Sequence, residues 1–424
     1  MIPGRRSKAL LKKLHRSEPP HVTYGDADFP VFIQKASGTN VWDADGNRYL
    51  DLTAFFAVSG LGHGAPAVRR AAQAVLDAGW HAMGDVHPHV LKAEAAEAVA
   101  SVLPKSLSQV WFSCNGSDAV ETALKTAYLA TGKPGVIAFD GAYHGLGYGA
   151  LQVTHRPFFR EPFASQGGAF GEFMPFPMEG TAKRGDTDRL LEWIRTRLQT
   201  SKLRKVGAVI IEPVQGRAGV RPVDPYFLKN LAPIVRSAGA LLIFDEIYSG
   251  FCRTGKWFAF EHYGVTPDLI CLGKGMSNGF PISACVSSPK IFGAWGPSRG
   301  EARHTSTFLG HPMGCAMTSA TIAELKRGRF DQKAAQTGTM LRLELEALVS
   351  RRPDVLAGVR GRGLMLGLVL RKPGSGSRLM KKLLKRGVIA LPSGENSDVL
   401  SLSPPLIIGP EEIKLSASRI SETL

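Results

Sequence analysis

Short apolar runs alternate with longer stretches of helical spacing along this chain, and this alternation constrains the fold most. The runs are four to six residues long and rich in branched side chains: Val136–Phe139, Val206–Ile211, Leu241–Phe244, Leu269–Leu272 and Ile282–Val286. Between several of them lie helical patterns: Ala119–Ala130, Thr187–Leu198 and Tyr226–Ser237. Such an alternation predicts an α/β fold with a mostly parallel central sheet flanked by helices. Ligands of these sheets bind beyond the carboxyl ends of the strands, so we expect the chemistry there.

A change of pattern near residue 322 indicates a second domain. The 424 residues leave room for about two or three domains. An amphipathic stretch, Asp331–Ser350, leads into a glycine-containing, hairpin-like segment that runs to Ile408. We therefore expect a large domain over 56–322, a smaller α+β domain over 323–424, and an N-terminal segment, 1–55, that packs with the small domain.

Neither a membrane protein nor a disulfide-bonded one is indicated. The longest apolar stretches fall far short of the ~18 to 20 residues of a membrane helix. Met1–Arg16 lacks the apolar core of a signal peptide. The five cysteines are scattered without a CxxC pair: Cys114, Cys252, Cys271, Cys285 and Cys315. We expect no disulfides, no metal site and a reducing, cytoplasmic location.

The net charge of +16 raises nucleic-acid binding as a function of another class. Three acid-free runs hold the excess: Arg5, Arg6, Lys8, Lys12, Lys13 and Arg16; Arg195, Arg197, Lys202, Arg204 and Lys205; Arg378, Lys381, Lys382, Lys385 and Arg386. Each lies in or beside a helical pattern, which favours solvated helix faces. Because no aromatic residues are interleaved with these bases, we expect no nucleic acid as a partner.

A phosphate site is indicated at the start of one helix. The usual nucleotide motifs are absent, but the strand Val110–Phe112 runs into Gly116, Ser117 and the helical segment Asp118–Ala130. Gly116 would let the backbone approach a phosphate, and Ser117 with the first helical amides would donate to it. The alternative is that Ser117 only caps the helix.

Two charged residues follow neighbouring predicted strands. Asp245 directly follows the run Leu241–Phe244. Lys274, 29 residues later, stands between two glycines after the run Leu269–Leu272. The pair alone would be explained by a structural ion pair. Together with the phosphate site, however, it meets the needs of pyridoxal phosphate: a lysine for a Schiff base, an acid for the pyridine nitrogen and an anchor for the phosphate.

The ordered motifs along the chain resemble the class III (subgroup II) pyridoxal-phosphate aminotransferases of fold type I. They comprise Trp42-Asp43 with Gly46 and Tyr49-Leu50-Asp51, Asn115-Gly116-Ser117, Tyr143-His144-Gly145, Glu212-Pro213-Val214-Gln215-Gly216, Asp245-Glu246 with Gly250-Phe251 and Arg253-Thr254-Gly255, Gly273-Lys274-Gly275, Thr305-Ser306-Thr307-Phe308 and Pro404-Pro405-Leu406. The resemblance implies pyridoxal 5'-phosphate as the cofactor and a site built at the interface of a homodimer or a dimer of dimers.

The resemblance also implies roles for individual residues. Lys274 would form the Schiff base and move protons, and Asp245 would pair with the pyridine nitrogen. The remaining expected cofactor-binding residues are Gly116 and Ser117 at the phosphate, Thr307 from a second subunit, Tyr143 and Ile247 on the two ring faces, and His144 and Glu212 in matching motifs. For His144, Glu212 and Arg253, a structural role is the alternative.

Departures from the family pattern concern the substrate. Tyr248 stands where Gln is frequent, and Cys252 where Gly is usual. Ser401 and Arg217 occupy the positions where ornithine and aminobutyrate enzymes carry a paired Arg and Glu. We expect Arg217, Tyr248, Ser401 and Phe55 to face the substrate, with Arg217 taking over the binding of a carboxylate.

The resemblance favours an aminotransferase that moves an amino group from a primary amine or omega-amino acid to a 2-oxo acid in a ping-pong reaction. An aminomutase or racemase on the same fold is the alternative within the fold, since it would keep Lys274 and Asp245 without needing an acceptor.

Overall fold

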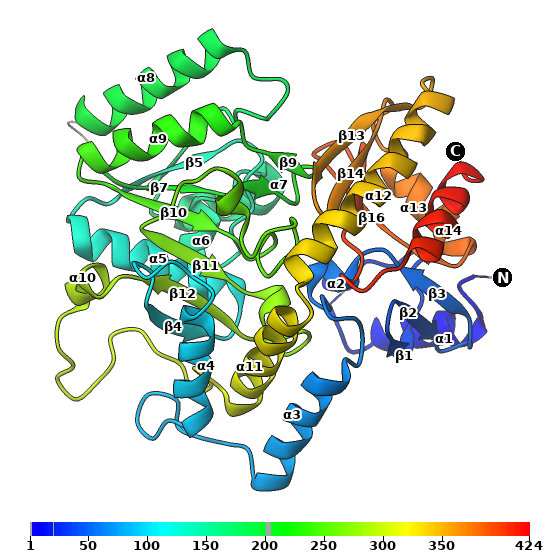
Figure 1. Cartoon of the computed structure of the whole chain (residues 1–424), viewed down its shortest axis with the longest axis horizontal. Coiled ribbons are helices and arrows are strands. Elements are labelled where there is room, and N and C mark those ends of the chain that lie inside the picture. Colours follow the sequence, from blue (N-terminus) through cyan, green and yellow to red (C-terminus); the bar gives the residue numbers. More distant parts are fainter. Residues whose placement is uncertain (1, 20, 201–204) are drawn as a thin grey trace.

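A seven-stranded sheet forms the centre of the large part of the molecule (Figure 1). The computed structural model describes residues 2–19, 21–200 and 205–424, so Lys202 and Arg204 of the second basic run lie outside the described residues. The strands are β4 (Gln109–Ser113), β5 (Gly135–Phe139), β6 (Gly171–Met174), β7 (Val206–Ile211), β10 (Leu241–Asp245), β11 (Leu269–Leu272) and β12 (Ser283–Ser287). They lie in the order β4-β12-β11-β10-β7-β5-β6. The predicted α/β fold class is confirmed.

Only β12 departs from the parallel direction in this sheet, since it pairs antiparallel with both β11 and β4. The other neighbours, β10 with β11 and β7, and β5 with β7 and β6, are parallel. The edge strand β6 was not predicted, because Gly171 and Glu172 interrupt the apolar pattern there.

Helices cover both faces of this sheet, which explains its apolar strands. Along β10, Leu242 and Phe244 face one core and Ile243 faces the other. On the second face α5 (Gly116–Thr131) packs against β4, β7, β10, β11 and β12. The other helices of the large part are α3 (Pro66–Ala78), α4 (Val90–Ala100), α6 (Tyr148–Gln152), α7 (Pro157–Arg160), α8 (Arg184–Thr200), α9 (Pro225–Ser237), α10 (Pro289–Phe292) and α11 (Pro312–Arg327). A small ladder joins β8 (Val214–Gln215) to β9 (Arg221–Pro222).

A four-stranded antiparallel sheet organises the C-terminal part. Its order is β13 (Leu356–Arg362), β14 (Met365–Leu370), β17 (Val399–Leu402), β16 (Leu391–Ser393). The accompanying helices are α12 (Phe330–Arg351), α13 (Ser375–Lys385) and α14 (Pro410–Ser421). The expected boundary after residue 322 lies inside α11, and the chain leaves right-handed helical geometry at Arg329, which has a φ of 50°.

The N-terminal segment lies beside the C-terminal part (Figure 1). Its strands β1 (Ile33–Ser37), β2 (Asn40–Asp43) and β3 (Arg48–Asp51) form a sheet with β15 (Val388–Ile389), which runs parallel to β3. Lys381 of α13 also pairs with Asp26 and Asp28. These contacts support the three-part division of the chain, which stays our proposal.

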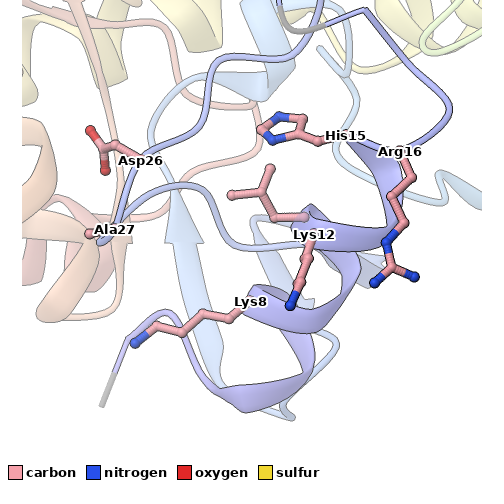
Figure 2. A pocket seen from close by; sticks show the side chains of 7 residues that line it. Lys8, Lys12, His15, Arg16, Asp26 and Ala27 are labelled. Atoms are coloured by element: carbon pink, nitrogen blue, oxygen red, sulfur yellow. The ribbon is translucent and has the colours of Figure 1, made fainter.

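The basic runs differ from one another in their surroundings. Lys381 and Lys385 form ion pairs, and Arg197 pairs with Glu172, so these bases are not simply solvated. The first run lies on α1 (Arg5–Leu14), where Lys8 and Lys12, together with Arg16 beyond its end, line a surface pocket of about 560 Å³ (Figure 2). All lining residues of this pocket come from positions 8–27.

Within the described ranges, no helix has the length and apolar character needed to span a membrane.

Candidate active site

The carboxyl ends of β10 and β11 bring Asp245 and Lys274 to one edge of the sheet. The two strands are parallel, with Asp245 opposite Cys271, so Lys274 follows just beyond the neighbouring strand end. Lys274 begins the short 3-10 turn η3 (Lys274–Met276) with a left-handed φ of 43°. Strained backbone of this kind is concentrated at functional sites. The predicted proximity of the two strand ends is confirmed by this register.

Asp245 is held in a fixed orientation by two groups. Its Oδ2 lies 2.8 Å from Nδ1 of His144, and its Oδ1 accepts a hydrogen bond of 3.1 Å from the amide of Ile247. Both residues are almost fully buried, with Asp245 6% and His144 2% exposed. A buried, oriented carboxylate of this kind suits a cationic ring nitrogen. His144 therefore contacts Asp245 directly. The sequence suggests either contact with the cofactor or a structural role for His144, and neither predicts this partner.

Lys274 has an amine suited to act as a nucleophile. Its Nζ lies 4.8 Å from the centre of the Tyr248 ring and has no hydrogen-bond partner among the described residues. Burial lowers the pKa of Lys274, the nearby Asp245 and Glu212 act against this shift, and Arg217 acts with it. A lowered pKa leaves more of the amine neutral near neutral pH, which is the reactive form.

The N-terminus of α5 has the properties of an anion site. Asn115, not Ser117, caps this helix, since its side chain accepts a 3.1 Å hydrogen bond from the amide of Asp118. The alternative role of Ser117 as a helix cap is therefore wrong. The Ser117 hydroxyl instead accepts from the amide of Gly147 at 2.9 Å, so its own hydrogen is available to an anion.

Gly116 allows close packing at the same helix start. A Cβ on Gly116 would lie 2.9 Å from Cδ1 of Ile247, so a larger residue would require Ile247 to move. Backbone amides without a covering side chain, at the positive end of a helix, are well suited to phosphate.

Glu212 fixes two loops of the site. Its Oε1 accepts from the amide of Tyr143 at 3.0 Å, and its Oε2 from the amide of Gly216 at 3.1 Å. Burial raises the pKa of Glu212. These contacts indicate that Glu212 positions Tyr143 and the loop containing Gly216.

The expected substrate residues come from separate parts of the chain. Arg217 places its guanidinium carbon 5.1 Å from the centre of the Tyr143 ring. The hydroxyl of Tyr248 lies 3.1 Å from that of Ser403. Ser401 is buried in β17, paired with Gly367 and Leu391. Sequence reasoning missed Ser403, whose only signal was its place directly before Pro404-Pro405.

Phe55 lies in an unusual left-handed turn. All four residues of α2 (Ala54–Ala57) have positive φ, although none is glycine. The turn lies against η3, because a Cβ on Gly275 would meet the carbonyl oxygen of Ala57 at 3.4 Å. The Phe55 ring lies 4.6 Å from that of His63. No sequence signal predicts this conformation, since glycine normally marks it.

Two further residues of the matching motifs, Thr307 and Arg253, have different surroundings. Thr307 is exposed on the loop before α11, and in the ranges covered by the structure no hydrogen bond joins it to Gly116 or Ser117 of its own chain. Arg253 is buried and donates to the carbonyl oxygens of Leu364 and Pro404, which gives it a structural role.

No cluster of three or more His, Cys, Asp or Glu side chains suited to a metal occurs within 2–19, 21–200 and 205–424.

These features fit pyridoxal phosphate in chemistry and position. A buried lysine amine, an oriented buried carboxylate and a helix start suited to an anion lie at the carboxyl edge of one sheet. Together they can hold a phosphorylated pyridine aldehyde at its phosphate, its ring nitrogen and its carbonyl carbon.

Comparisons with known proteins agree with this interpretation. The acetylornithine aminotransferase of Methanopyrus kandleri is 35% identical over 420 residues, which cover 99% of this chain and 98% of that protein. The putrescine aminotransferase of Pectobacterium atrosepticum is 34% identical over 398 residues, covering 92% and 81%. The crystal structure of an (S)-enantioselective omega-transaminase from Thermomicrobium roseum matches with a TM-score of 0.89 and 28% identity, covering 98% of each chain. Residues 22–424 match the family described as aminotransferase class-III. The chain therefore belongs to the class III aminotransferases, which transfer amino groups with pyridoxal 5'-phosphate as cofactor and share the fold type I architecture.

Proposed function

We propose that the enzyme transfers an amino group from a primary amine or an omega-amino acid to a 2-oxo acid, in two half-reactions that share one site. Support for the donor class comes from the relatives, which include a putrescine aminotransferase and an omega-transaminase. The observation that carries the proposal is the shared strand edge of Asp245 and Lys274 beside the start of α5. Family membership favours this reaction over a mutase, a racemase or a nucleic-acid-binding protein.

Each residue of the site has a distinct task in this proposal. Pyridoxal phosphate, when bound, supplies an electron sink for the bonds of the carbon that bears the amino group. Asp245, oriented by His144, holds a proton on the ring nitrogen. Lys274 forms the covalent link to the cofactor and carries a proton at its Nζ. Gly116 and Ser117 bind the phosphate.

The walls of the site hold the ring and the substrate. Tyr143 and Ile247 pack against the two ring faces, and Glu212 positions Tyr143 through its backbone amide. Tyr248, with its hydroxyl next to Ser403, and Phe55, from the left-handed turn beside η3, face the substrate. Ser401 adds a small neutral side chain in β17 where a bulkier cationic one would restrict the donor.

We also propose that the enzyme is a homodimer. An exposed apolar surface extends along α3, the segment after it and the loop before α11: Leu76, Trp80, Met83, Val86, Val90 and Phe308. Thr305 donates to Asp85 at 2.7 Å, which joins the two segments. Patches of this kind mark protein interfaces. Thr307 belongs to this surface and would reach the phosphate site of the second subunit.

A cytoplasmic location is part of the same proposal. It is supported by the five cysteines, all of which are free thiols.

A spectroscopic experiment tests the reaction. The cofactor absorbance of the loaded enzyme is followed after a donor is added alone, and then after a 2-oxo acid is added. A transferase loses the absorbance of the lysine-linked cofactor with the donor and regains it with the oxo acid. A mutase or racemase would not need the second substrate, so its absorbance would return without an acceptor.

A further inference from the structure

The Arg217 guanidinium lies beside the reacting amine without an acidic partner. It lies over Tyr143, with its Cζ 5.1 Å from the ring centre. Its positive charge helps to lower the pKa of Lys274. Among the residues that the structure describes, no carboxylate forms an ion pair with Arg217. Arginine is rarely left partly buried without an anion, because its five donors need acceptors.

The backbone of the loop that carries Arg217 is nevertheless held by several hydrogen bonds. The Ser393 hydroxyl of β16 lies 3.0 Å from the carbonyl oxygens of both Gly216 and Arg217, and the Gly394 amide donates to the Arg217 oxygen at 3.2 Å. Glu212 accepts a further hydrogen bond from the Gly216 amide at 3.1 Å. A fixed backbone combined with an unpaired planar donor is a preorganised anion site.

The position of this guanidinium selects the kind of anion. The carbon that exchanges its amino group must come within bonding reach of Lys274, and the charge of Arg217 acts on the Lys274 amine, so a carboxylate on that carbon would be attracted to the same guanidinium. A guanidinium and a carboxylate match in a planar, bidentate pair.

We propose that Arg217 binds the carboxylate adjacent to the keto group of the 2-oxo acid acceptor, and that Ser393 positions it. A donor without a carboxylate leaves this arginine on Tyr143. The inference rests on the proposed amino transfer, and it identifies the carboxylate subsite of that same site.

Direct binding of an unreactive carboxylate tests the inference without relying on turnover. The dissociation constant of propanoate is measured by calorimetry on the cofactor-loaded wild type, Arg217→Ala and Arg217→Lys, with propanamide as the uncharged counterpart. Arg184→Ala is the matched control, since Arg184 also lies over a tyrosine ring, that of Tyr226, but on α8. We expect Arg217→Ala to weaken propanoate binding at least about tenfold, with a smaller loss for Arg217→Lys. Propanamide binding and the control should not change. An unchanged propanoate constant in Arg217→Ala, or an equal loss for propanamide, would overturn the inference.

Separate half-reactions provide a second readout. We expect Arg217→Ala to lower kcat/KM for pyruvate at least about tenfold, while kcat/KM for n-butylamine changes less than about threefold. Ser393→Ala should raise KM for pyruvate with little change in kcat, because it loosens the loop alone. Equal losses with both substrates would contradict the role of Arg217. If the wild type carried out neither half-reaction, the proposed function would fail, while the propanoate measurement would still decide whether Arg217 binds a carboxylate.

Discussion

Asp245→Asn tests the central assignment of the site most directly, because the change keeps the shape of the side chain and removes its charge. In the structure Asp245 is 6% exposed and is oriented by His144 at 2.8 Å and by the Ile247 amide at 3.1 Å. A neutral amide in this place can no longer favour a protonated ring nitrogen. Removing one member of a buried, hydrogen-bonded charge pair costs about 2 to 5 kcal/mol.

That range sets the expected size of the effect. At about 1.4 kcal/mol for each tenfold change, the half-reaction with a donor should slow by roughly 30- to 4,000-fold. Cofactor retention during gel filtration should fall as well. The assay is a single turnover with saturating donor, followed by the cofactor absorbance, together with a thermal melt that checks folding.

Asp268→Asn provides a matched control, because Asp268 lies just before β11 and contacts the end of β10 opposite to Asp245. Asp268 accepts from the amide of Leu242 at 2.9 Å at the start of β10, so its amide variant perturbs the strand without touching the site. We expect its half-reaction rate to stay within about threefold of the wild type. If Asp245→Asn folded normally and kept a rate within the same range, the assignment of Asp245 to the ring nitrogen would be wrong.

Three further variants test other parts of the site. Lys274→Ala should leave a folded protein that binds the cofactor without a covalent link, shown by reversible loss on dialysis, and turns over at least about 10²-fold more slowly; near-normal turnover would refute its role. Gly216→Ala should lower the melting temperature by several degrees, because the new Cβ would lie 2.1 Å from Cδ1 of Tyr248 and overpacking costs about 1 to 3 kcal/mol; an unchanged melt would show that Tyr248 moves freely. Dilution to the monomer should release the cofactor, and Thr307→Ala should weaken cofactor binding in the dimer; a monomer with full cofactor affinity would exclude a contribution from the second subunit.

The ionisation of Lys274 gives a prediction in pH. Arg217 helps to lower the pKa of Lys274, since a nearby positive charge disfavours the ammonium form. Arg217→Ala should therefore raise this pKa, so that cofactor-free enzyme captures pyridoxal phosphate with a pH profile displaced toward higher pH. A profile that stayed in place, or moved to lower pH, would mean that the guanidinium does not act on the amine.

The local sequence pattern was enough to locate the central strands and to place Asp245 and Lys274 at neighbouring strand ends. The predicted runs Val206–Ile211 and Leu269–Leu272 coincide with β7 and β11, because a strand buried on both faces must be apolar throughout and polar residues mark its ends. Asp245 and Lys274 follow from the same rule, since Asp245 comes directly after such a run and Lys274 comes after another, with only Gly273 between. The motifs then identified the family, because their order and spacing can be read directly along the chain.

The features that join distant segments could be seen only in the folded chain. Nothing in the local pattern distinguishes the antiparallel β12 from its parallel neighbours, and the pairing of β15 with β3 joins residues more than 300 positions apart. The left-handed turn Ala54–Ala57 lacks glycine and is visible only in the folded chain. Likewise, the sequence marked Arg217 as unusual, but its place over Tyr143 and the hydrogen bonds from Ser393 depend on loops brought together by folding. Local periodicity encodes which residues form an element, whereas the contacts between elements are set by packing of the whole molecule.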